Sequence, residues 1–147
     1  MLAHPYQLSG KVMPGEHIGN QLGFPTANLQ PDDPFKLIPA SGVYAVWAQV
    51  ADQTTPSRRL LHEDAISYLG GEALPAMMNI GTRPTFDGRN RTLEVNIFDF
   101  DCNLYGQTVI ITFVARLREE RKFESPEALV RQLKADKERV IRVLRED

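Results

Sequence analysis

The sequence predicts a mainly β protein, an antiparallel sheet or barrel with one α-helix packed on it. Three observations support this fold class. Several segments alternate apolar and polar residues or are rich in β-branched and aromatic residues. Only the C-terminal segment has a convincing helical pattern, and strands and helices do not alternate as βαβ units do. With 147 residues, the chain has room for one domain, which we expect over residues 1–147.

Five segments have the composition expected of strands. In Thr92–Phe100 the alternation is clearest: Leu93, Val95 and Ile97 share one face, while Glu94 and its alternate neighbours share the other. The Gly-containing link that follows predicts a hairpin between this segment and the next strand. The five predicted strands are residues 6–13, 42–50, 75–80, 92–100 and 108–117.

The connections between these strands differ in character. Pro14–Pro39 is dense in Gly and Pro and lacks a sustained period, so we expect a long but packed loop. Residues 52–71 are expected to be an insertion or excursion from the core. Gly81–Asn90 has the composition of a turn-rich segment.

The predicted helix covers residues 125–145. Ser125 is a suitable N-cap, and Pro126 suits the first helical position. Apolar residues then recur on one face, at Leu129, Leu133, Val140 and Leu144. The opposite face is charged, so the helix should lie on the sheet with one side in water.

Composition excludes several classes of protein. The net charge is −2, so no general cationic field would gather nucleic acid or anionic lipid. Cys102 is the single cysteine, which excludes an internal disulfide and a multi-cysteine zinc site. There is no Walker-type phosphate loop and no long apolar run. We expect a cytoplasmic protein without membrane or nucleic-acid partners.

The segment Pro25-Thr26-Ala27-Asn28 is chemically suggestive. In extended geometry Thr26 and Asn28 project to the same side, and their neutral oxygens suit Mg²⁺. A turn that satisfies its own backbone explains the same residues, and physical reasoning alone favours the turn. Upstream, Gly15 and Gly19 would let backbone N–H groups approach an anion, but an ordinary turn-rich loop has the same spacing.

Two further features have two interpretations each. Glu94, on a strand, could act as a general base on a hydroxyl, although a solvent-facing glutamate is the more common case. A basic cluster at the end of the last strand could hold a phosphate or an anionic ring, or could be a solvated turn paired with nearby glutamates. Its members are Arg116, Arg118, Arg121 and Lys122.

Taken together and in order, these segments resemble the riboflavin kinase family, specifically the kinase half of bacterial bifunctional riboflavin kinase/FAD synthetases. The first matching motif is Gly23-Phe24-Pro25-Thr26-Ala27-Asn28. The other matching segments are residues 42–45, 79–86, 94–100, 104–106 and 117–123. They cover most of the chain.

The resemblance implies a compact antiparallel Greek-key β-barrel with one C-terminal helix. It also implies transfer of a phosphoryl group from ATP to the ribityl 5′-hydroxyl of riboflavin, giving FMN and ADP. Carried over by motif, Glu94 is the general base, and Thr26 and Asn28 bind Mg²⁺ and the terminal phosphates. The resemblance also implies that Gly15, Gly19 and Pro25 lie near the phosphates of ATP. Ile97, Asp99 and Tyr105 would lie near the rest of the nucleotide, and Arg118 and Arg121 would contact the flavin.

This sequence departs from the family pattern at two positions. Asn20 stands where family members usually have Arg or Lys, and Asn103 stands where Asp is usual. His4–Gly10 resembles the junction with an FAD synthetase half. We therefore expect an excised C-terminal domain or a stand-alone kinase that cannot by itself make FAD. The alternative function is a catalytically weak flavin-binding module that stores or delivers FMN.

Overall fold

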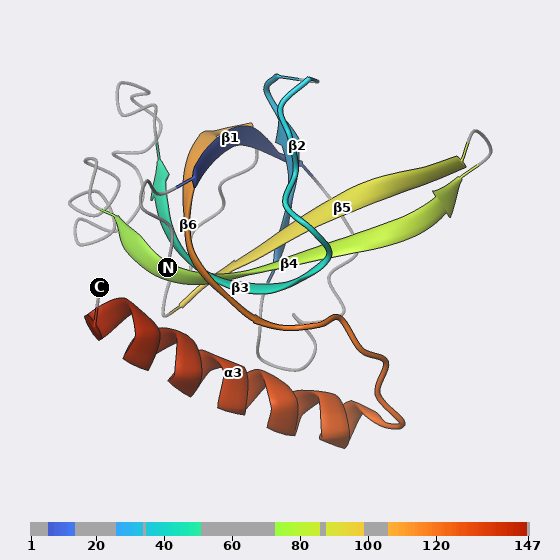
Figure 1. The fold of residues 1–147 in the computed structure, drawn as a ribbon, viewed down its shortest axis with the longest axis vertical. Coiled ribbons are helices and arrows are strands. Elements are labelled where there is room, and N and C mark those ends of the chain that lie inside the picture. Colours follow the sequence, from blue (N-terminus) through green and yellow to red (C-terminus); the bar gives the residue numbers. More distant parts are fainter. Residues whose placement is uncertain are drawn as a thin grey trace.

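The computed structural model describes residues 6–13, 26–33, 35–50, 73–85, 88–98 and 106–146. These residues form six strands and one helix, labelled in Figure 1. The strands are β1 (Tyr6–Met13), β2 (Ala27–Pro31), β3 (Gly42–Val50), β4 (Leu74–Thr85), β5 (Gly88–Ile97) and β6 (Thr108–Arg118), and the helix is α3 (Pro126–Glu146).

The six strands close into a barrel in the order β1-β2-β5-β4-β3-β6, and every neighbouring pair is antiparallel. Strands β3, β4 and β5 are neighbours in sequence and in space, whereas β2 crosses over to lie beside β5. This arrangement is a Greek key. The predicted fold class, a Greek-key barrel with one C-terminal helix, is therefore confirmed.

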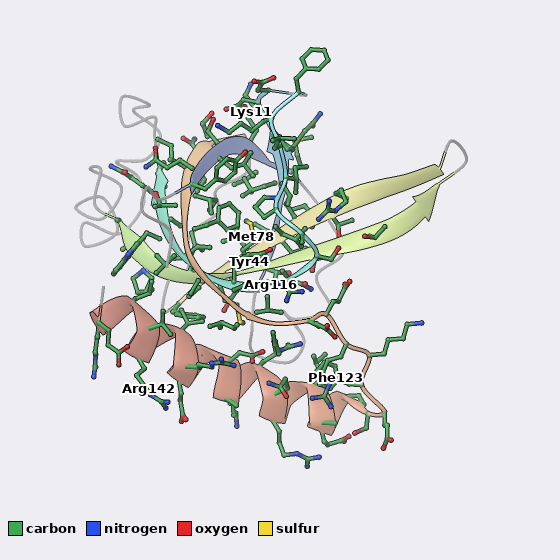
Figure 2. The ribbon with its side chains drawn as sticks, in the orientation of Figure 1. Lys11, Tyr44, Met78, Arg116, Phe123 and Arg142 are labelled. Carbon is green, nitrogen blue, oxygen red and sulfur yellow. The ribbon has the colours of Figure 1, made fainter. Side chains whose placement is uncertain are left out.

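The inward face of each strand fills the barrel. Leu93, Val95 and Ile97, which were predicted to share one face of their strand, are all buried there. Met78 is fully buried, and Figure 2 shows it with Tyr44 inside the barrel. The alternation of strand side chains thus sends the intervening residues of β4 and β5 to the outer wall.

A second core lies between the outer wall of the barrel and α3. The helix packs against β3, β4 and β6, as Figure 1 shows. At its start, the backbone N–H of Ala128 donates to Ser125 Oγ over 3.2 Å, which confirms the predicted N-cap. This core contains Val43, Ala45, Met77, Phe98, Leu117, Val140 and Leu144.

Two predicted connections are wrong. The expected hairpin between residues 92–100 and 108–117 does not form, because β4 and β2 occupy the two edges of β5. Gly81–Asn90 is not mainly turn, since β4 and β5 stay paired as far as Thr85↔Gly88. That hairpin extends beyond the barrel (Figure 1), where no core requires apolar side chains, so the hydrophobic pattern does not reveal it.

The predicted loop at residues 14–39 contains a strand, β2. Leu29 is its one buried side chain, and a single buried residue is too little to produce a visible period. The excursion predicted at residues 52–71 lies outside the described residues. In the described part of the chain, no helix is both long enough and apolar enough to span a membrane.

Candidate active site

A row of polar residues crosses three adjacent strands of the outer wall. Asn28 on β2 pairs with Glu94 on β5, and Glu94 pairs on its other side with Asn79 on β4. Directly opposed residues of antiparallel strands point to the same face. Their sequence neighbours Leu29, Val95 and Ile80 are in the barrel core, so the row faces outward. All three polar residues are half-buried.

Thr26 directly precedes β2 and extends this row at the start of that strand. The β2–β5 register pairs Ala27 with Val95, and its continuation brings Thr26 toward Asn96. Asn96 is 5% exposed, on the same face of β5 as Glu94. The hydroxyl of Thr26, the amides of Asn28, Asn79 and Asn96 and the carboxylate of Glu94 therefore lie on one part of the outer wall. This part is next to the region that α3 covers.

The connection between β6 and α3, residues 119–125, borders the row. A Cβ atom built on Gly81 would lie 2.7 Å from Glu120 Oε1 and 2.8 Å from Thr92 Oγ1. Gly81 and Thr92 are cross-strand partners, one step along the same face from Asn79 and Glu94. The absence of a side chain at Gly81 therefore lets the connection lie close against the wall at the edge of the polar row.

Two cationic side chains gather at this connection. Arg118 donates to both carboxylate oxygens of Asp136 on α3, with Nη2 2.8 Å from Oδ2 and Nε 3.1 Å from Oδ1. Arg121 Nη1 lies 3.4 Å from Gln132 Oε1. The guanidinium carbons of both arginines lie over the Phe123 ring, 5.8 and 5.1 Å from its centroid.

The helix fixes this cationic group. Gln132 Nε2 donates to Asp136 Oδ1 over 2.8 Å, so one carboxylate ties together the end of β6 and the first half of α3. The side chain of Asp136 is 3% exposed and that of Arg118 is 16% exposed. Figure 2 shows Phe123 beside the start of the helix. The partner of Arg118 is thus a helix carboxylate rather than one of the nearby glutamates of the connection.

The structure brings together some of the predicted site residues and separates others. Thr26, Asn28 and Glu94 meet on the outer wall, and Arg118 and Arg121 meet beside Phe123. Ile97 lies in the barrel core, on the opposite face of β5 from Glu94, so its side chain is not part of the polar row. Gly15, Gly19, Pro25, Asp99 and Tyr105 lie outside the described residues. The Arg116 side chain is directed elsewhere, to the carbonyl oxygen of Ser41.

Sequence reasoning missed two polar residues that the structure places here. Asn79 is the one polar side chain among the apolar residues of Pro75–Ile80, and that exception was a usable signal. Asp136 lies between Leu133 and Val140 on the apolar stripe of the helix. A charged residue on a buried stripe almost always has a partner.

The donor set of the wall fits a hard divalent cation. Mg²⁺ prefers oxygen ligands and is usually held by few protein groups, with phosphate oxygens and water completing its shell. Thr26 and Asn28 supply neutral oxygens, and Glu94 supplies a negative charge beside them. Within the described residues there is no group of three or more His, Cys, Asp or Glu side chains that could hold a metal alone.

The fold and site define a Greek-key β-barrel protein with an oxygen-rich row on its outer wall and a cationic connection beside it. Comparison with known proteins identifies the family. The family model Flavokinase, described as riboflavin kinase, matches residues 2–144. The chain belongs to the riboflavin kinase family.

Individual relatives agree with this assignment. The chain is 34% identical over 145 residues to the bifunctional riboflavin kinase/FMN adenylyltransferase of Bacillus subtilis, covering 97% of this chain and 40% of that protein. It is 35% identical over 130 residues to the RNA-binding riboflavin kinase RibR of the same organism, covering 88% of this chain and 47% of that one. Among solved structures, riboflavin kinase from Trypanosoma brucei superimposes with a TM-score of 0.64 at 27% identity, covering 96% of this chain and 78% of that one. The chain thus spans less than half the length of these two curated relatives.

Proposed function

We propose that this chain transfers the terminal phosphoryl group of ATP to the 5′-hydroxyl of riboflavin, giving FMN and ADP. The observation that supports this reaction best is the direct cross-strand pairing of Asn28 with Glu94. It holds a ligand for phosphate and metal one strand spacing, about 4.8 Å, from a carboxylate that can take a proton. A hydroxyl at Glu94 would then face a phosphate held at Asn28.

Each residue of the row has a role in this proposal. Glu94 aligns the 5′-hydroxyl and accepts its proton as the new P–O bond forms. Thr26 and Asn28 hold Mg²⁺, which when bound neutralises charge on the phosphate oxygens. Phosphoryl transfer depends mainly on positioning and charge neutralisation, so a rigid barrel wall is a suitable support for these groups.

The cationic connection is the proposed flavin side of the site. A guanidinium group is planar and stacks on flat conjugated rings, and Phe123 adds an aromatic surface. Arg118 and Arg121 are already gathered at this ring. Because Glu120 of the same connection lies against Gly81 of the wall, a flavin held there would direct its ribityl chain toward Glu94.

The relatives suggest a fate for the product. Bifunctional relatives carry an FMN adenylyltransferase, which consumes FMN. We propose the same sequence of reactions here, with the adenylyl transfer performed by a separate domain or protein.

The direct test incubates the purified chain with riboflavin, ATP and Mg²⁺ and measures FMN by chromatography with fluorescence detection. Glu94→Gln, which keeps the shape of the side chain, should lower kcat by about 10²–10⁴-fold while riboflavin and ADP still bind. Chelation of Mg²⁺ should abolish turnover. Glu138→Gln, on the exposed face of α3, is the matched control and should keep full activity.

Two results would contradict the proposal. FMN formation by Glu94→Gln at the unsubstituted rate would remove Glu94 from the role of base. Tight riboflavin binding by the unsubstituted chain without any FMN formation would instead indicate a flavin-binding module.

A further inference from the structure

Asn79 has a buried polar atom that no group in the described part of the structure satisfies. Its Oδ1 is buried and has no hydrogen-bond partner within the described part of the structure. Buried acceptors are normally paired, so an unpaired acceptor on a site wall calls for a reason. Gln107 Oε1 is in the same condition, but Gln107 directly precedes β6, where its backbone carbonyl accepts from Val12 on β1 rather than from a residue of β4 or β5.

The position of Asn79 restricts what could satisfy it. On β5 its cross-strand partner is Glu94, and on β3 its partner is Val43. Val43 belongs to the apolar core beneath α3 and offers no donor. Glu94, as a carboxylate, is also an acceptor. Neither cross-strand neighbour of Asn79 therefore supplies the missing donor, and a substrate hydroxyl would reach this oxygen only if the atoms that now cover it shift.

We infer that Asn79 Oδ1 accepts a hydrogen bond from a hydroxyl of the substrate's polyol chain, next to the hydroxyl that Glu94 deprotonates. This inference rests on the proposed function. A polyol presents several hydroxyl donors in succession, and one carboxylate cannot receive them all. Two acceptors on neighbouring strands, about 4.8 Å apart, can receive two hydroxyls along one chain. Asn79 is thus a substrate-binding residue that fixes which hydroxyl meets the base.

The same pairing gives a reason for the unpaired oxygen. A site built to accept a hydroxyl loses affinity for an analogue that lacks it, because the buried acceptor then stays unpaired. Asn79 would make the site selective for a flavin that carries a polyol over a bare ring system. Without substrate this oxygen has no hydrogen bond, and the bound substrate would supply one.

The test compares two flavins on two leucine variants. Riboflavin and lumiflavin share the ring system, but lumiflavin has a methyl group in place of the polyol. Dissociation constants are measured by quenching of flavin fluorescence. Asn79→Leu, similar in size but without the amide, should weaken riboflavin binding by about tenfold and leave lumiflavin binding unchanged. Gln107→Leu, which removes the other unpaired buried oxygen, should change neither.

Thermal unfolding without ligand separates binding from structure. Removal of an unpaired buried acceptor should leave the Tm of Asn79→Leu equal to or above that of the unsubstituted chain. In turnover, the KM for riboflavin should rise while the KM for ATP stays constant. If Asn79→Leu yields too little folded protein, Asn79→Thr suits a strand and permits the same flavin comparison.

The outcomes are separable. Equal weakening of riboflavin and lumiflavin, or unchanged riboflavin binding, would overturn the role of Asn79 while leaving FMN formation intact. A clear fall in Tm in both Asn79→Leu and Asn79→Thr would also overturn this role, since it would show that Asn79 is needed for the structure itself. Failure of the unsubstituted chain to form FMN would refute the proposed function, yet the flavin comparison would still report on Asn79.

Discussion

The buried ion pair between Arg118 and Asp136 allows a quantitative prediction. Asp136→Asn removes the negative charge without opening a cavity and leaves the guanidinium of Arg118 without its counter-ion. Loss of one partner of a buried pair costs about 3–5 kcal/mol. Arg118 keeps 16% of its side-chain surface exposed, so water partly compensates it and the lower end, about 3 kcal/mol, applies. For a domain of this size the Tm should fall by about 6–12 °C.

Differential scanning calorimetry, supported by urea unfolding, measures this effect. Glu138→Gln removes a carboxylate from the exposed face of the same helix and should change stability by less than about 0.5 kcal/mol. The double variant Arg118→Met with Asp136→Leu replaces the pair by apolar groups and should be more stable than Asp136→Asn. A loss below about 1 kcal/mol in Asp136→Asn would refute the view that this carboxylate anchors β6 to α3.

Three further perturbations follow from the packing. Met78→Ala, at a position with no exposed surface, should destabilise the fold by about 2–5 kcal/mol, whereas Met13→Ala, at a position that is 38% exposed, should have a much smaller effect in the same urea titration. Gly10→Ala would place a Cβ atom 2.6 Å from the carbonyl oxygen of Gln30, so it should cost about 1–3 kcal/mol; unchanged stability would show that β1 and β2 can separate freely. Ser125→Ala removes the acceptor for the first turn of α3 and should cost about 0.5–2 kcal/mol, measured by loss of helical circular dichroism on heating.

A strand could be predicted from the sequence when several of its side chains face the core. Residues 92–97 were predicted correctly because Leu93, Val95 and Ile97 all enter the barrel. β2 was missed because Leu29 is its one buried residue, and backbone pairing with β1 and β5 holds the rest. The outer part of the β4–β5 hairpin was missed for the same physical reason. Backbone hydrogen bonding leaves no mark on hydrophobic periodicity.

The sequence proposed candidate site residues but did not show how they are arranged in space. Physical reasoning from the residues favoured a plain turn at Asn28 and a solvent-facing Glu94, and the family resemblance gave them the roles of metal ligand and base. No local pattern could show that they are opposite each other on neighbouring strands. That pairing depends on the order in which strands close the barrel. Asn79 and Asp136 were visible as polar exceptions in apolar segments. The cross-strand neighbour of Asn79, Glu94, and the ion-pair partner of Asp136, Arg118, become clear once β4 and α3 are placed.

The narrow pairing of β2 with β5 has a consequence for how ligand and fold influence each other. Among the described residues, Ala27↔Val95 and Asn28↔Glu94 are the registered pairs between β2 and β5, while β4 and β5 are paired along most of their length. In the described part of the barrel, the fewest registered strand pairs therefore lie at the proposed phosphate and metal site. A nucleotide bound there would hold β2 and β5 together and would slow amide hydrogen exchange in β2 more than in β4. Nucleotide binding and the pairing of β2 with β5 would then be thermodynamically coupled, so that each one favours the other.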